Sequence, residues 1–401
     1  MTSSFDSSRL RSLDGVRGLA SVVVLLWHAF LIAQPHLADG LHEGGAAPGT
    51  PYWWLVDSPL SILIAGEQAV LVFFLLSGIV LTLPVIRTPR YNWVAYYPRR
   101  ILRLYLPVVV SVVLAAILLI VVPRAPTPIA AWQWTDNAHS FDPLGAVTAA
   151  ALVNPRPAIN GPLWSLTWEM AFSLALPLFV LIAVRVGRWW IAAVIGAVLL
   201  VDLGVVLDIS PLKFLPVFLI GALAAVNIDG VMASARRLSD APRHRMLWSS
   251  VLLASTLLMT AFKASSTLLA PEFAWVTTVL SGFVIVGCMG LVFVSMGSGA
   301  ARRVLESRSV QWTGRLSFSL YLVHVPLMIA ISYAFGWDLW WLAILVSVPL
   351  SFALAAAFTK LVEQPAHTLS KGVGRTVDRW SRRHEADHVA VVPAAGDAGA
   401  S

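Results

Sequence analysis

Three ionisable side chains, Asp14, Arg17 and His28, lie in the otherwise apolar stretch LDGVRGLASVVVLLWHAF. In an α-helix the eleven residues from Arg17 to His28 make about three turns, so both side chains lie on one face, about 16 Å apart along the axis. Histidine can take up a proton near neutral pH, and arginine binds anions well. The spacing therefore predicts a base and an anion site on one helix face. The alternative is a hydrogen-bonded core histidine and an arginine that extends to the membrane surface.

Three arginines gather in the stretch YYPRRILRLYLP, namely Arg99, Arg100 and Arg103. Arg99 and Arg103 are four residues apart and share a helix face. Because arginine binds phosphate through two parallel hydrogen bonds, the cluster predicts a phosphate clamp. The same charges could instead only orient a membrane helix, and the sequence leaves both explanations open.

A single carboxylate, Glu169, stands about two turns into the apolar stretch LWSLTWEMAFSLALP, on the same helix as Trp164 and Trp168. A carboxylate inside a membrane span either pairs with a cation or takes part in function. The sequence does not decide between these two roles. The two indole rings are typical of a membrane–water interface.

A polar stripe runs along GRLSFSLYLVHVPL, where Ser317, Tyr321 and His324 occupy positions i, i+4 and i+7. Such a stripe binds a substrate or joins helices by hydrogen bonds. In FFLLSGIVLT, Ser77 precedes a glycine, and this small pair permits close approach of a ligand or, more commonly, of another helix. Glu363, in LVEQPAH, is interpreted as mainly architectural and as a partner for a cytoplasmic arginine.

The elements that must position these residues are membrane helices. The chain has 401 residues, of which 58% are hydrophobic and 12% charged, and its mean hydropathy is +0.78. Soluble domains carry about 25% charged residues, so the composition predicts an all-α, polytopic membrane helix bundle. We expect about ten transmembrane helices, at roughly residues 14–34, 60–84, 102–122, 163–184, 189–207, 212–228, 247–264, 274–297, 316–335 and 339–362.

The distribution of basic residues predicts the topology. Ten spans place 24 of the 28 Lys and Arg residues in the tails and in the even-numbered connections. The positive-inside rule then puts both termini in the cytoplasm of a cell-membrane protein. We expect a cytoplasmic tail at 1–11, a transmembrane domain at 12–364 and a disordered cytoplasmic tail at 365–401. The long outer loop contains one short apolar stretch, GAVTAAALV, which predicts an interfacial or re-entrant helix.

Several kinds of site are not supported by the sequence. The histidines are widely spaced and Cys288 is the only cysteine, so no metal site is predicted. No P-loop or G-x-G-x-x-G motif occurs, and we expect no tightly bound cofactor. The net charge of +7 is explained by membrane topology, so nucleic acid is not an expected partner.

Taken in order, these stretches resemble the acyltransferase-3 family of integral-membrane O-acyltransferases, from about residue 11 to residue 366. The most specific is LDGVRGLASVVVLLWH, which matches the family's pattern of an arginine, ten residues and a histidine at Arg17 and His28. The stretches FFLLSG, RRILRLYLP, LWSLTWE, SFSLYLVH and EQP also match. The family pattern often has an acidic residue where this chain has Val72, and an aromatic residue where it has Ile79. These two departures would change the shape of the pocket that binds the acceptor.

The resemblance implies transfer of an acyl group, often acetyl, from a coenzyme A thioester to a hydroxyl. The acceptor would be a cell-envelope glycan or a glycosylated natural product such as a macrolide, and the lipid bilayer would surround the enzyme. We expect His28 to be the general base, with Arg17 and Glu169 also catalytic. Acyl-CoA would bind as a co-substrate to Arg17, Arg99, Arg100, Arg103 and Ser77. The acceptor would bind to Trp164, Tyr321 and His324.

Two other functions remain open at this stage. Ten spans with buried ionisable groups also fit a proton-coupled secondary transporter that exports a sugar or an antibiotic, although no inverted repeat is visible. A non-catalytic partner in glycan assembly would tolerate the loss of His28. Consumption of acyl-CoA separates these functions from acyl transfer.

Overall fold

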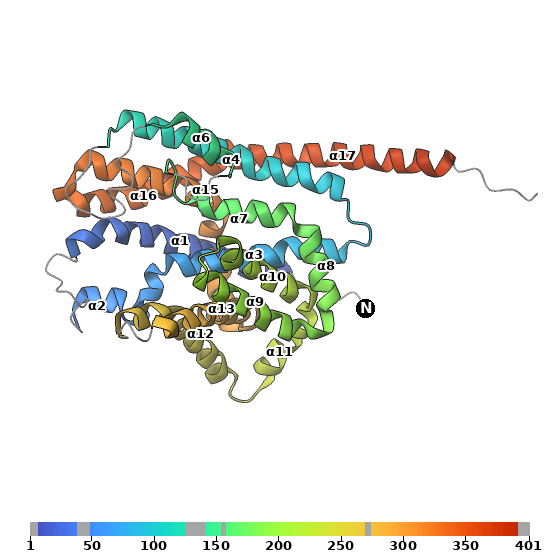
Figure 1. The fold of residues 1–401 in the computed structure, drawn as a ribbon, viewed down its shortest axis with the longest axis horizontal. Helices are drawn as coiled ribbons and strands as arrows, with labels where there is room; N and C mark the ends of the chain where they lie inside the picture. Colours follow the sequence, from blue (N-terminus) through green and yellow to red (C-terminus); the bar gives the residue numbers. More distant parts are fainter. Residues whose placement is uncertain (1–6, 38–48, 125–140, 154–157, 269–273, 392–401) are drawn as a thin grey trace, which may run out of the picture.

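The computed structural model describes residues 7–37, 49–124, 141–153, 158–268 and 274–391, and these residues form helices and turns without any β-strand (Figure 1). The predicted all-α class is therefore confirmed for the described part of the chain. Residues 1–6 of the predicted N-terminal tail, most of the long loop and residues 392–401 lie outside the described residues.

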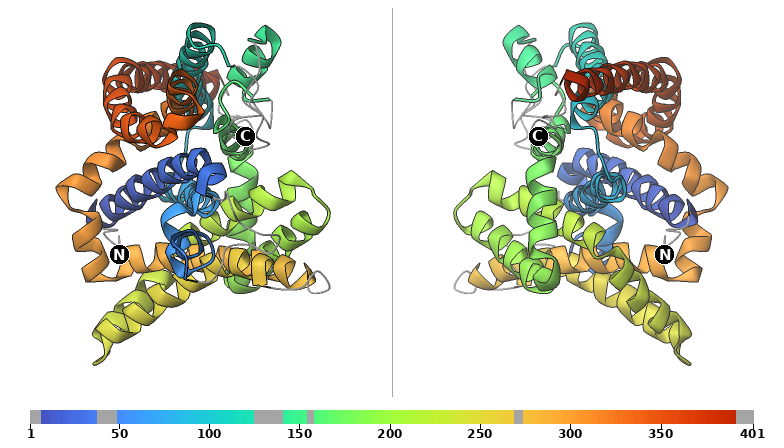
Figure 2. Two further views of the ribbon diagram at one scale, coloured as in Figure 1. Left: turned by 90° about the vertical axis from the view of Figure 1, so that its left-hand side faces the viewer. Right: turned by 90° about the vertical axis from the view of Figure 1, so that its right-hand side faces the viewer.

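The centre of the molecule consists of four helices: α1 (Ser7–Leu37), α3 (Gly66–Arg87), α10 (Ser210–Val226) and α15 (Arg308–Phe335). α1 packs against α15 and α3, and α3 packs against α10. Seen end-on in Figure 2, the blue α1 and α3 lie in the middle, and the later helices surround them. Apolar residues on all sides of these helices explain why they are central.

Glycines set the distance between the central helices. A Cβ at Gly78 on α3 would collide with the carbonyl oxygen of Phe218 on α10, and a Cβ at Gly221 would collide with that of Leu75. On the other side, Gly18 of α1 faces the backbone of α15 at Gly314. Gly78 therefore serves helix packing, the more common of the two roles predicted for the Ser77-Gly78 pair, and the acyl-CoA-binding role of Ser77 stays a prediction.

A second layer contains α4 (Trp93–Val121), α16 (Trp340–Phe358) and α17 (Gln364–Val391). Asn92 caps α4 by accepting a hydrogen bond from the Ala95 N–H, and its amide donates to Asp378 and Ser381 on α17. The prediction of a disordered tail from residue 365 is wrong, because α17 is helical to Val391 and packs along α4. The tail is charged and weakly hydrophobic, but it continues a helix that has already formed, so no new helix nucleus is needed. Packing against α4 stabilises it further.

The remaining helices pack around this centre. They are α7 (Leu163–Leu174), α8 (Leu176–Val186), α9 (Trp190–Val206), α11 (Ile228–Asp240), α12 (His244–Leu268), α13 (Ala274–Gly297) and α14 (Gly299–Leu305). The short elements are α2 (Pro51–Val56), η1 (Pro59–Ile64), α6 (Pro143–Ala150), η2 (Gly187–Trp189), η4 (Trp337–Leu339) and the π-helical turn η5 (Thr359–Glu363). α6 confirms a helix in the apolar stretch of the long loop.

Within the described residues, six helical stretches are long and apolar enough to cross a membrane. They are Arg11–Leu37, Gly66–Arg87, Trp93–Val121, Leu176–Val206, Arg308–Phe335 and Trp337–Arg383. Two bent pairs, α10 with α11 and α13 with α14, raise the number to eight if each pair is one span. A polytopic helix bundle is thus supported, whereas the number of ten spans remains a prediction.

The helix ends differ from the predicted spans in informative places. The predicted span 163–184 is divided between α7 and α8, because the chain breaks at Ala175 just before Pro177. The predicted span 102–122 is part of a longer helix that begins at Trp93, so the three arginines lie inside α4. The predicted span 339–362 belongs to a continuous helical stretch of 47 residues.

Candidate active site

Two histidines from distant parts of the chain meet between α1 and α15. His324 Nε2 lies 3.2 Å from His28 Nδ1, and the two rings are nearly perpendicular. Each Nδ1 also faces the carbonyl oxygen four residues earlier, Val24 for His28 at 2.9 Å and Leu320 for His324 at 2.8 Å. α1 and α15 thus hold both rings in fixed orientations.

These partners assign the protons on the neutral rings. A carbonyl oxygen only accepts, so the Nδ1–H of His324 donates to Leu320, and Nε2 of His324 is left as an acceptor. The Nδ1–H of His28 then donates to Val24 and to His324 Nε2 together. Nε2 of His28 has no hydrogen-bond partner among the described residues, so it carries the free lone pair and is the basic atom of the two rings.

His28 lines a cavity of about 340 Å³ together with Tyr321 and Trp164. Glu67, at the start of α3, and Pro162, before α7, belong to the same wall. The structure therefore brings together His28 and three predicted acceptor residues, since His324 touches His28 directly. A cavity of this size is typical of a site for a small ligand.

The hydroxyl of Tyr321 has a fixed structural role in the wall of this cavity. It donates to the carbonyl oxygen of Pro162 at 2.7 Å and lies 2.6 Å from Ser165 Oγ, which then donates to it. Nearby, the amide of Asn160 donates to the carbonyl oxygen of Leu322 at 3.0 Å. These bonds attach the start of α7 to α15 and so place Trp164 opposite His28.

Glu169 lies with the arginines rather than with His28. Arg100 Nη2 donates to Glu169 Oε1 at 2.6 Å, and Arg100 Nε donates to Ser173 Oγ at 3.0 Å. The Ser173 hydroxyl donates in turn to the carbonyl oxygen of Glu169. Of the two roles that the sequence left open, pairing with an arginine is the one observed. No hydrogen bond joins the Glu169 carboxylate to His28 within the described residues.

A group of charged side chains surrounds Arg17 on α1. Arg103 interacts electrostatically with Arg17, Arg100 and Glu363, and Asp14 interacts with Arg17 and Arg103. Glu363 accepts a hydrogen bond from Ser319 Oγ, which also receives one from Thr359. The predicted role of Glu363 as a structural partner of arginine agrees with these contacts.

Two other residues that were predicted to bind acyl-CoA, Arg99 and Ser77, lie outside this charged group. Arg99 is exposed and lies against Gly374 of α17, where a Cβ would collide with its guanidinium group. Beside it, burial raises the pKa of Tyr91 although Arg99 and Arg100 oppose the shift, so this tyrosine stays a neutral hydroxyl. Ser77 is half-buried on α3, and no hydrogen bond in the described part of the chain links it to the arginines or to His28.

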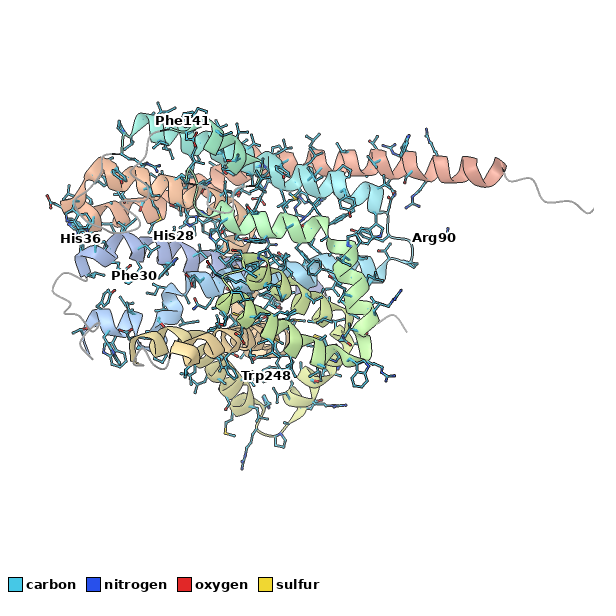
Figure 3. The ribbon with its side chains drawn as sticks, in the orientation of Figure 1. His28, Phe30, His36, Arg90, Phe141 and Trp248 are labelled. Carbon is cyan, nitrogen blue, oxygen red and sulfur yellow. The ribbon has the colours of Figure 1, made fainter. Side chains whose placement is uncertain are left out.

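The two groups of residues occupy opposite ends of the helix bundle. Figure 3 labels His28 and His36 along α1 and Arg90, in the connection before α4, on the far side of the molecule. Following the chain directions, Arg17, Arg100 and Arg103 lie toward the Arg90 end, which we call the arginine end. His28 and Glu67 lie toward the other end, which we call the histidine end.

Glu67 was not among the residues selected from the sequence. It is an ionisable residue inside the predicted span 60–84, and the same criterion that singled out Glu169 applies to it. In the structure it lines the His28 cavity at the first turn of α3.

Comparison with known proteins agrees with the geometry. An acyltransferase MdmB from Streptomyces mycarofaciens is 30% identical over 199 residues, which is 47% of this chain and 44% of the relative. The match thus covers less than half the length of that curated protein. No solved structure matches the chain. The acyltransferase-domain model of the acyltransferase-3 family matches residues 10–360, a range that contains every predicted site residue, and the chain therefore belongs to this family.

Proposed function

We propose that the protein is a membrane O-acyltransferase that moves an acyl group, acetyl in the simplest case, from acyl-CoA to a hydroxyl of a sugar-bearing acceptor. The acceptor would be a glycosylated natural product or a cell-envelope glycan. The observation that carries the proposal is the free Nε2 of His28 in a cavity closed by Trp164 and Tyr321. Family membership supports acyl transfer, and the site supplies the base that this reaction needs.

The proposed reaction requires one proton to move twice. His28 Nε2 takes the proton of the acceptor hydroxyl while the hydroxyl oxygen attacks the thioester carbonyl carbon. The tetrahedral intermediate then collapses, the carbon–sulfur bond breaks, and the CoA sulfur leaves with the proton from His28. His324 accepts a hydrogen bond from His28 Nδ1–H, which stabilises the ring when it is positively charged.

The proposed donor site is the arginine end. Arg17, Arg99 and Arg103 would bind the phosphates of acyl-CoA, whereas Arg100 already pairs with Glu169 and would contribute less to phosphate binding. The thioester arm would extend along α1 from Arg17 to His28, which are about 16 Å apart along a helix axis. In this proposal the arginine end and both termini would lie in the cytoplasm, and the protein would lie in the cell membrane.

The test is the release of free CoA thiol from acetyl-CoA by the protein in lipid nanodiscs, with a panel of glycosides as acceptors. Wild-type protein should release thiol in an acceptor-dependent manner, and both His28→Ala and Arg17→Ala should abolish release while retaining the folded state. Release that survives His28→Ala would remove His28 as the base. Proton-coupled uptake of a glycoside into liposomes, without thiol release, would favour a transporter instead.

A further inference from the structure

A second cavity adjoins the His28 cavity at the histidine end. It has a volume of about 710 Å³ and lies among α3, α7, α9, α10 and α13. Glu67 and Trp164 line both cavities, so these two side chains form the boundary between them. A ligand that fills both spaces must therefore pass beside Glu67 and Trp164.

The larger cavity is lined by an aromatic group and an aliphatic group of side chains. The ring centroids of Trp164 and Phe214 are 5.0 Å apart, and those of Trp168 and Phe214 are 5.6 Å apart, which makes a continuous aromatic surface. Val205 of α9 and Ile285 of α13 belong to the aliphatic part. Aromatic faces accommodate the C–H faces of sugars as well as apolar groups, whereas the aliphatic part suits only apolar groups.

The charges at this cavity leave one carboxylate available for a ligand. Asp208 is neutralised by an ion pair with Lys213 at 2.5 Å. Glu67 is exposed, and within the described part of the chain its carboxylate makes no ion pair or hydrogen bond. An ionised carboxylate has two oxygens that only accept hydrogen bonds, so Glu67 suits a ligand that presents hydroxyl groups.

We propose that the acceptor is an amphiphilic glycoside that occupies both cavities. Its sugar ring lies at the boundary, on Trp164, with hydroxyl groups donating to Glu67 and the reacting hydroxyl directed to His28. Its apolar aglycone fills the larger cavity, in contact with Val205 and Ile285. The proposal rests on the proposed acyltransferase function for the step at His28, and it excludes a fully polar polysaccharide as the preferred acceptor.

Transfer kinetics test the proposal with methyl, hexyl and octyl β-glucosides and acetyl-CoA, using protein in lipid nanodiscs. Wild-type kcat/KM should rise at least tenfold from the methyl to the octyl compound. Val205→Trp should flatten this rise, with kcat/KM for the octyl compound falling several-fold more than that for the methyl compound, because the new ring occupies the aglycone space. Equal kcat/KM along the series in wild-type protein would overturn the proposal.

The role of Glu67 is tested separately. Glu67→Gln should raise KM for every glucoside about tenfold, since a charge-assisted hydrogen bond becomes a neutral one, with KM for acetyl-CoA unchanged. The matched control is Glu306→Gln, which changes a carboxylate paired with Arg302 on α14. A rise in KM for acetyl-CoA, or an equal effect in the control, would contradict the assignment of Glu67.

A binding measurement separates this proposal from the proposed function. Ser210→Cys places a thiol in the larger cavity, and Ser234→Cys places one on the exposed surface of α11. Octyl glucoside should slow maleimide labelling at position 210 but not at position 234, and octanol should protect less than the glucoside. Protection without thiol release from acetyl-CoA would keep the binding site and overturn the enzymatic function. Absence of protection would overturn the binding site.

Discussion

At the scale of single residues, the orientation of His28 depends on a proton that it shares with two acceptors. The carbonyl oxygen of Val24 and Nε2 of His324 both face His28 Nδ1, at 2.9 and 3.2 Å. Removal of either acceptor leaves the other, so the ring remains in one tautomer. His324 is therefore a positioning residue, whereas His28 touches the reacting atoms in the proposed mechanism.

The two histidines should respond differently to substitution. His28→Ala should lower kcat by roughly 10²–10⁴-fold, the usual contribution of a general base. His324→Ala should lower kcat by about tenfold and shift the acidic limb of the pH profile to lower pH, because the His28 imidazolium loses a hydrogen-bond acceptor and gives up its proton more readily. His324→Gln, which can supply an amide oxygen, should recover part of the loss. Equal losses in both alanine variants would contradict this division of roles.

Sequence patterns identified both histidines, but each was a separate feature of its own helix. The contact between them joins residues 296 positions apart, and it depends on how α1 packs against α15. Helix periodicity states which face a residue occupies and not which helix it meets. For the same reason the sequence could not decide whether Glu169 pairs with an arginine, and it missed Glu67, whose significance comes from the cavities around it.

At the scale of helices, the Arg100–Glu169 pair joins α4 to α7. Both side chains are mostly buried, with 11% and 21% of their areas exposed. Ser173 and the hydroxyl of Tyr96, which donates to the carbonyl oxygen of Ser173, extend the junction. The start of α7 is thus attached to α15 at the histidine end, and its later turns are attached to α4 at the arginine end.

Breaking this pair should destabilise the protein. Glu169→Gln should cost about 3 kcal/mol of stability, because Arg100 keeps its charge in a poorly solvated place. The double variant Arg100→Met with Glu169→Leu should be close to wild type in stability, since neither charge remains. Thermal unfolding in nanodiscs measures both. If the double variant is as unstable as the single one, the pair has a role beyond neutralising charge.

The crossing of α3 and α10 is a second junction between helices. Gly78→Ala should cost about 1–3 kcal/mol, because the added methyl meets the backbone of Phe218 and the helices must separate. Ser77→Ala is the matched control at the neighbouring position and should have little effect on stability. A loss of CoA binding in Ser77→Ala, measured by titration calorimetry, would support the prediction that Ser77 binds acyl-CoA.

The attachment of α17 to α4 makes another prediction. Asn92→Ala removes the hydrogen bonds to Asp378 and Ser381, and it also removes the cap of α4. Limited trypsin digestion should then cut after Arg382 and Arg383 several-fold faster than in wild-type protein. Asn92→Asp keeps the cap but loses the amide donor, so it should also be cut faster. Protection equal to wild type in both variants would show that packing alone holds α17.

Hydrophobicity predicted most helices correctly but placed several ends wrongly. Apolar runs identify where a helix crosses a membrane, and they carry no information on helical turns outside it. α4 therefore begins before its predicted span, and α17 continues beyond the last one, because polar residues form helix when a neighbouring helix supports them. The break at Ala175 depends on Pro177. Because Pro177 lies within an apolar stretch, hydrophobicity alone does not reveal the break.

At the scale of the whole molecule, the chain has two chemically distinct ends. In Figure 1, α1 begins at one side of the bundle, and α17 runs toward that same side. This side is the arginine end, where Arg17, Arg100 and Arg103 lie. The distribution of basic residues predicted this asymmetry, because an asymmetry of charge depends only on where the charged residues lie and on the order of the spans. It could not predict the number of crossing helices, since short and bent helices have similar composition.

The two-ended arrangement predicts opposite accessibility for the two ends of α15. Ser307 precedes α15 at the arginine end, and Asp338 follows it at the histidine end, and both are exposed. Cys288 is buried, so it should contribute little background. In intact cells, a membrane-impermeant maleimide should label Asp338→Cys, whereas Ser307→Cys should react only after permeabilisation. Labelling of both positions from one side would show that α15 does not cross the membrane.

The pairing of His28 with His324 also has a consequence for biosynthesis. A ribosome delivers α1 to the membrane first and α15 only after most of the chain has been made, so a growing chain carries His28 without its partner. The cavity wall is missing during the same period, because Tyr321 arrives with α15. An unfinished chain therefore holds His28 without its contact to His324 and without this wall of the cavity. The cavity around His28 is therefore complete only when translation is almost complete.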